Sequence, residues 1–108
     1  MIVRATIQYF DGCPSWEDAR SNLEAAALEV GTDLDVSLQR VETDQDAERL
    51  RFVGSPTILL DGRDPFAVAG APPALACRVY ATPNGLAGSP TVAQIVAVLR
   101  ASQVHTTN

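Results

Sequence analysis

The first part of the chain changes its apolar pattern twice, and these changes limit the folds open to it. Apolar and polar residues alternate from Val3 to Phe10, which predicts a β-strand. Apolar residues then recur at helical spacing from Trp16 to Val30, and residues 34–39 alternate again. A helix of this length is enough to join two parallel strands. The pattern therefore predicts a parallel strand–helix–strand unit.

Shorter elements are expected in the middle of the chain. Thr43 resembles a helix N-cap and begins a short helix that ends near Leu50. Residues 57–60 are uniformly apolar, as is typical of a short strand buried on both faces. Residues 63–76 contain three prolines and a glycine, too many helix breakers for a helix of any length.

The last part of the chain predicts one more strand and one more helix. Residues 77–80 alternate, with Cys77 and Val79 on one face and Arg78 and Tyr80 on the other. Ser89 followed by Pro90 marks a helix start, with serine as N-cap and proline in the first turn. The complete order predicts an α/β fold of three layers, a four-stranded mixed sheet with helices on both faces.

The length of 108 residues suits one domain with one core. We expect this domain to cover residues 1–102. Residues 103–108 are polar and contain the single histidine, His105, and we expect them to be a disordered tail.

Charge and composition exclude several classes of function. The net charge is −5, and the eight arginines, with no lysine, are scattered among acidic residues, so we expect no nucleic-acid partner. No apolar run is long enough to span a membrane, and no signal-peptide pattern precedes the first strand, so a cytoplasmic protein is expected. One histidine and two cysteines do not make a closed zinc site, and no metal or cofactor is expected. Composition does not predict the oligomeric state.

Cys13 is the main candidate for chemistry. The segment Cys13-Pro14-Ser15-Trp16 lies between the first strand and the first helix. Free N–H groups and the dipole at a helix N-terminus stabilise a thiolate. The acidic residues nearby oppose that effect, so the reactivity of Cys13 stays open. These residues are Asp11, Glu17 and Asp18.

The order of elements resembles the thioredoxin fold over roughly residues 2–102, with Cys13 after the first strand and Gly54-Ser55-Pro56-Thr57 before the third. In that family a cis-proline faces the active-site cysteine, and the residue before it offers backbone hydrogen bonds to the substrate. The resemblance implies a cis Ser55–Pro56 bond close to Cys13. It also implies a substrate-binding surface made by Pro14, Ser15, Trp16, Ser55 and Pro56.

The chain departs from the family pattern at Trp16, where a redox dithiol would have its second cysteine. A local two-cysteine cycle is therefore excluded. Cys77 is the possible resolving cysteine, but a disulfide requires Cα atoms within about 7 Å. In the simple topology Cys77 begins the fourth strand at the end distant from Cys13. Contact between the two would need an unusual path of residues 63–76.

Three functions remain open. The first is thiol–disulfide exchange through a single thiol, Cys13, with a low-molecular-weight thiol or a disulfide-containing protein as partner; Arg78 could then hold an anionic thiol. The second is a thioredoxin-like binding module without catalysis. The third rests on the segments FDGCP, GSPT and CRVY, which look similar to those of proteins described as alkylmercury lyases. That resemblance implies mercury held by Cys13 and Cys77, with a carboxylate as proton donor.

Overall fold

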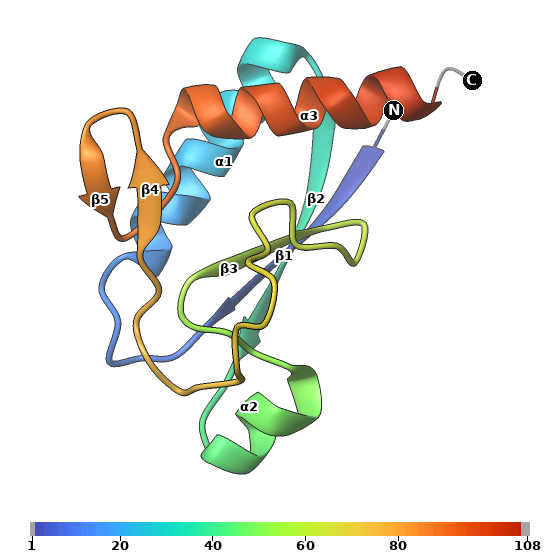
Figure 1. Cartoon of the computed structure of the whole chain (residues 1–108). Coiled ribbons are helices and arrows are strands. Elements are labelled where there is room, and N and C mark those ends of the chain that lie inside the picture. Colours follow the sequence, from blue (N-terminus) through green and yellow to red (C-terminus); the bar gives the residue numbers. More distant parts are fainter. Residues whose placement is uncertain (1, 107–108) are drawn as a thin grey trace.

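The computed structural model describes residues 2–106, with side chains described as far as residue 101. Figure 1 shows the arrangement of its three helices and five strands. In chain order they are β1 (Ile2–Tyr9), α1 (Trp16–Val30), β2 (Asp33–Arg40), α2 (Asp44–Leu50), β3 (Thr57–Leu60), β4 (Tyr80–Thr82), β5 (Gly85–Ala87) and α3 (Val92–Thr106).

The main sheet has three strands in the order β2-β1-β3. The central strand β1 is parallel to β2, with Val3 opposite Leu34, and antiparallel to β3, with Ile7 opposite Ile58. The parallel strand–helix–strand unit expected from the sequence is confirmed. α1 ends where Gly31 adopts a left-handed conformation (φ 79°), which glycine tolerates without steric cost.

The core lies between this sheet and the pair α1 and α3, which pack against each other (Figure 1). Alternate residues of β1 point into it, as the period of a strand requires. Removing this apolar surface from water is the main contribution to stability. The buried members are Val3, Ala5, Ile7, Ala19, Leu23, Ala26, Ala27, Ile58, Leu60, Ile95, Val96 and Leu99.

α2 belongs to a separate, smaller cluster rather than to the second face of the sheet. Its Ala47 packs with Val41 and Phe52, and Figure 1 shows α2 well apart from α1 and α3. Thr43 caps this helix as predicted, because its hydroxyl accepts a hydrogen bond of 3.0 Å from the N–H of Asp46. The prediction of a four-stranded sheet with helices on both faces is therefore wrong. β4 and β5 form a separate two-stranded hairpin.

The fourth strand is lost from the main sheet because residues 74–78 pair with the segment before β3 instead of with β3 itself. The N–H of Ala74 donates to the carbonyl of Phe52 at 2.8 Å. The N–H of Ser55 donates to the carbonyl of Ala76, and the N–H of Arg78 donates to the carbonyl of Ser55, both also at 2.8 Å. The bridge between Ser55 and Cys77 is parallel, and the chain then forms the β4–β5 hairpin.

The last helix begins later and runs further than expected. Thr91 and Gln94 form a capping box, since the Thr91 hydroxyl accepts from the N–H of Gln94 and the Gln94 side chain accepts from the N–H of Thr91. This pair, rather than Ser89, sets the start of α3. The helix continues to Thr106, past the domain boundary expected at residue 102 and into the expected tail. The end of that tail, residues 107–108, lies outside the described residues.

Among the described helices, none has the length and apolarity needed to cross a bilayer.

Candidate thiol site

Cys13 is a buried thiol held in the turn between β1 and α1. Only 1% of its surface is exposed. Its N–H donates to the carbonyl of Phe10 at 3.1 Å, and its sulfur donates to the carbonyl of Ser55 at 3.3 Å. Because α1 begins only at Trp16, Cys13 precedes the first helical turn instead of forming part of it.

Cys77 lies beside the same residue, Ser55. It forms a parallel β-bridge with Ser55, flanked by the two backbone hydrogen bonds of Ala76 and Arg78. Both cysteines are free thiols, and Cys77 is the exposed one of the two. The structure therefore brings together Cys13 and Cys77, which the simple topology had placed apart. The parallel pairing of residues 74–78 is the unusual path that this contact requires.

Cys77 lies close to Cys13 because both are held at Ser55. Their hydrogen bond is the largest influence that raises the pKa of the Cys77 thiol above its usual value; burial and the charge of an ionised Cys13 raise it further. Since Cys77 lies at the surface, the neighbouring sulfur, more than burial, keeps the proton on Cys77. A raised pKa leaves less thiolate on Cys77 at neutral pH, so any advantage of Cys77 as a nucleophile comes from its exposure and not from its acidity.

This interaction predicts a pH shift in alkylation. In the wild-type protein, iodoacetamide should modify Cys77 with a midpoint at higher pH than in the Cys13→Ser variant, where the neighbouring sulfur is absent. Stopped alkylation followed by peptide mass spectrometry measures both profiles. Equal midpoints in the two proteins would contradict the contact between the thiols.

The Ser55–Pro56 peptide bond is cis, as the resemblance implied. Neither residue forms an open surface, since Ser55 and Pro56 are both fully buried. The Ser55 N–H and carbonyl are hydrogen-bonded within the chain, and its hydroxyl accepts from the N–H of Phe10 at 3.3 Å. The backbone expected to bind a substrate thus binds residues 76–78 of the same chain.

The other expected site residues differ in their surroundings. Pro14 is exposed, and the hydroxyl of Ser15 makes no capping hydrogen bond to α1. Ser15 instead lies against Gly88, where an added Cβ would overlap the Oγ of Ser15. Trp16 packs on the main core and stacks on Tyr9, with ring centroids 4.4 Å apart. These contacts make the half-buried Trp16 ring part of the packing around the main core.

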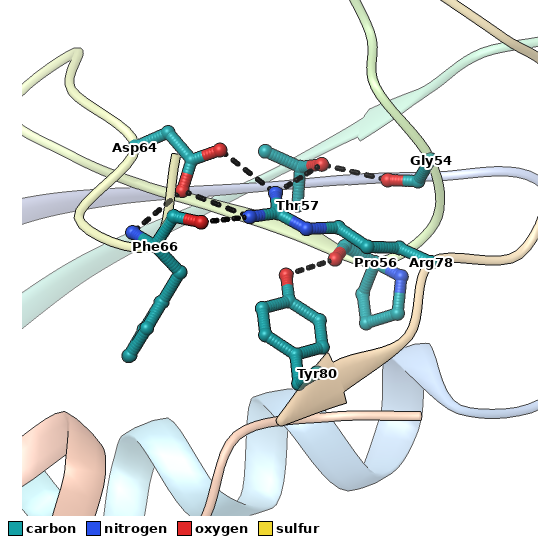
Figure 2. A network of polar contacts seen from close by, with 7 residues as sticks. All are labelled: Gly54, Pro56, Thr57, Asp64, Phe66, Arg78 and Tyr80. Atoms are coloured by element: carbon teal, nitrogen blue, oxygen red, sulfur yellow. Dashed lines mark hydrogen bonds and ion pairs between the residues drawn. The ribbon is translucent and has the colours of Figure 1, made fainter. Parts of the chain in front are cut away.

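A buried polar network holds the segment that carries Cys77 (Figure 2). The guanidinium of Arg78, with its side chain 8% exposed, forms an ion pair with Asp64 at 2.7 Å. It also donates to the carbonyl of Phe66 at 2.6 Å and to the hydroxyl of Thr57 at 3.2 Å. Arg78 lies over the ring of Tyr80, 4.5 Å from its centroid. The guanidinium of Arg78 is therefore engaged within the chain and is not a free cation for an anionic thiol.

The same network reaches the cis-proline. The hydroxyl of Thr57 donates to the carbonyl of Gly54 at 2.6 Å, and the hydroxyl of Tyr80 donates to the carbonyl of Pro56. Burial raises the pKa of the Tyr80 phenol, against the opposing effect of Arg78, so this hydroxyl keeps its proton and remains a donor. The network thus joins both sides of the Ser55–Cys77 bridge.

Sequence reasoning missed the part that Asp64, Thr57 and Tyr80 play. The alternation of Arg78 and Tyr80 showed that they share a face, but no local pattern links them to Asp64.

In the described part of the chain, no cluster of three or more histidine, cysteine or acidic side chains is placed to hold a metal ion. Comparisons with protein-family models, with curated proteins and with solved structures found no match.

Proposed function

We propose that Cys13 and Cys77 act together as a dithiol in thiol–disulfide exchange. The observation that carries this proposal is that both cysteines are held at Ser55. The sulfur of Cys13 donates to the Ser55 carbonyl, and Cys77 forms a β-bridge with Ser55. The cis Ser55–Pro56 bond and the β2-β1-β3 strand order support the thioredoxin-like part of the proposal. The expected location is the cytoplasm, where such thiols are kept reduced.

The exposure of the two sulfurs sets the order of the steps. An incoming disulfide meets the exposed Cys77 first, whose thiolate attacks one sulfur, forms a mixed disulfide and releases the other half as a thiolate. Cys13 then attacks the sulfur of Cys77 and releases the second half. The products are a Cys13–Cys77 disulfide and two small thiols, which take up the two protons lost by the protein. In this scheme Cys77 is the first nucleophile and Cys13 resolves it, the reverse of the order expected from the sequence.

Trapping the intermediates tests this scheme. Reduced protein is mixed with hydroxyethyl disulfide, quenched with iodoacetamide and mapped by mass spectrometry. The wild-type protein should give an internal Cys13–Cys77 disulfide within a monomer. Cys13→Ser should instead accumulate the mixed disulfide on Cys77, and Cys77→Ser should react at least about tenfold more slowly because its remaining thiol is buried.

The outcomes separate this proposal from its alternatives. A stable mixed disulfide on the wild-type protein, with no internal disulfide, would contradict a dithiol cycle. A protein in which neither thiol reacts would favour the binding module. Release of the alkane from an organomercurial by the wild-type protein, lost in both cysteine variants, would favour the lyase instead.

A further inference from the structure

The backbone groups of Ser55 are all engaged within the chain. Its N–H donates to Ala76, and its carbonyl accepts both from the N–H of Arg78 and from the sulfur of Cys13. Recognition of an extended peptide by strand addition requires free N–H and carbonyl groups on an accessible edge. At this position the strand is already present, and it is the segment that carries Cys77.

The segment that carries Cys77 is also held by hydrogen bonds and an ion pair to other parts of the chain. Arg78 joins it to Asp64, Phe66 and Thr57, and Ala74 joins it to Phe52. An incoming peptide could take its place only by breaking these hydrogen bonds and by separating an ion pair whose side chains are 8% and 15% exposed. Separating a buried pair leaves an uncompensated charge, which is strongly unfavourable.

The accessible part of the segment is the face that carries Cys77. Cys77 is exposed, and Val79, on the same face of the segment, is 60% exposed. A cavity of about 220 Å³ borders the segment at Arg78 and Val79. A second cavity, of about 370 Å³, lies beside the turn that holds Cys13 and is lined by Phe10, Asp11, Gly12, Arg40, Val41, Glu42 and Leu75. Both volumes lie near the lower limit of the roughly 300–1,000 Å³ of sites that enclose larger ligands.

From this arrangement we infer that the thiol site accepts low-molecular-weight disulfides and excludes extended polypeptides. The inference rests on the proposed exchange function and specifies its substrate class. The chain's own residues 76–78 occupy the strand position that a polypeptide substrate would need. A small disulfide needs only access to the sulfur of Cys77.

Two probes with the same leaving group test the inference. One is the mixed disulfide of mercaptoethanol with a single blocked cysteine; the other carries the same mixed disulfide on the central cysteine of an extended octapeptide. Reduced wild-type protein should react with the single-residue probe at least about tenfold faster, because access limits the rate with the octapeptide. An octapeptide that reacts as fast or faster would overturn the inference while leaving the exchange function in place. No reaction with either probe would overturn the exchange function, and the inference with it.

A variant in which the side chain of residue 78 no longer holds residues 76–78 provides a second test of the inference. We call the Asp64–Arg78 ion pair the clamp, because it holds the segment that carries Cys77. The double substitution Asp64→Asn with Arg78→Met removes both charges of the clamp, so that neither is left buried alone. Its matched control, Asp46→Asn with Arg49→Met, removes an ion pair at the surface. Circular dichroism verifies the fold of both variants. In the clamp variant, the rates of reaction with the single-residue probe and with the octapeptide should differ less than in the wild-type protein; in the control they should differ as much as in the wild type. A variant whose backbone amide at position 78 exchanges faster, but whose ratio of rates with the two probes is unchanged, would also overturn the inference.

Discussion

Replacing Arg78 with methionine is expected to lower the free energy of unfolding by about 3–5 kcal/mol, the range for breaking a buried ion pair from one side. The variant leaves the carboxylate of Asp64 without its cation, and the carbonyl of Phe66 without its donor. We expect a value near the lower end, because the side chain of Asp64 keeps 15% of its exposure to water. Urea unfolding followed by circular dichroism measures the change.

Two further variants show whether the buried charge is the cause. Asp64→Asn in the Arg78→Met background should recover part of the loss, since the amide is much less costly to bury than a carboxylate. Arg49→Met makes the same substitution in the exposed pair with Asp46 and should cost less than about 1 kcal/mol. Similar losses for Arg78→Met and Arg49→Met would contradict the view that Arg78 clamps the Cys77 segment.

Gly54→Ala is expected to lower the free energy of unfolding by about 2–5 kcal/mol, because it strains the backbone and overpacks a close contact. Gly54 has a φ of 123°, a conformation that L-residues rarely adopt. An added Cβ would stand 2.8 Å from the Cβ of Arg78 and 3.3 Å from the carbonyl oxygen of Ala76. Because both neighbours belong to the segment around Cys77, the variant should also slow formation of the internal disulfide.

Gly62→Ala is the matched control for this prediction. Gly62 also has a positive φ, 84°, but an added Cβ would meet nothing within 4 Å. Gly62→Ala should therefore lower the free energy of unfolding only by the roughly 1–2 kcal/mol that a left-handed backbone costs an L-residue. The rate of disulfide formation should not change. Urea unfolding gives the stabilities, and timed alkylation gives the rates. Equal effects of the two substitutions on the disulfide would argue against close packing of Gly54 on the Cys77 segment.

Local patterns were sufficient for the elements whose partners lie near in sequence. The alternation of β1 and β2 and the helical spacing of α1 predicted the parallel unit, because each pattern repeats along a single element. The left-handed end of α1 at Gly31 and the cap of α2 at Thr43 also depend only on residues within one turn. The start of α3 was misplaced because Thr91 and Gln94, just after the expected cap at Ser89, form the capping box that sets the helix start.

The fourth strand was wrongly predicted for a different reason. Residues 77–80 alternate as a strand does, and alternation does not specify which neighbour the strand pairs with. Pairing with Ser55 rather than with β3 depends on the path of residues 63–76. That path is fixed by contacts such as Asp64 with Arg78, which no periodicity records.

The amino-acid sequence by itself determined a small α/β domain with Cys13 after the first strand and a proline at position 56 before the third. Only the tertiary structure decided that Cys77 lies beside Cys13 and that residues 76–78 fill the strand position next to Ser55. The physical reason is that backbone hydrogen bonds are the same for every partner strand. The choice between partners came from a buried ion pair and its hydrogen bonds, which form only when distant parts of the chain meet.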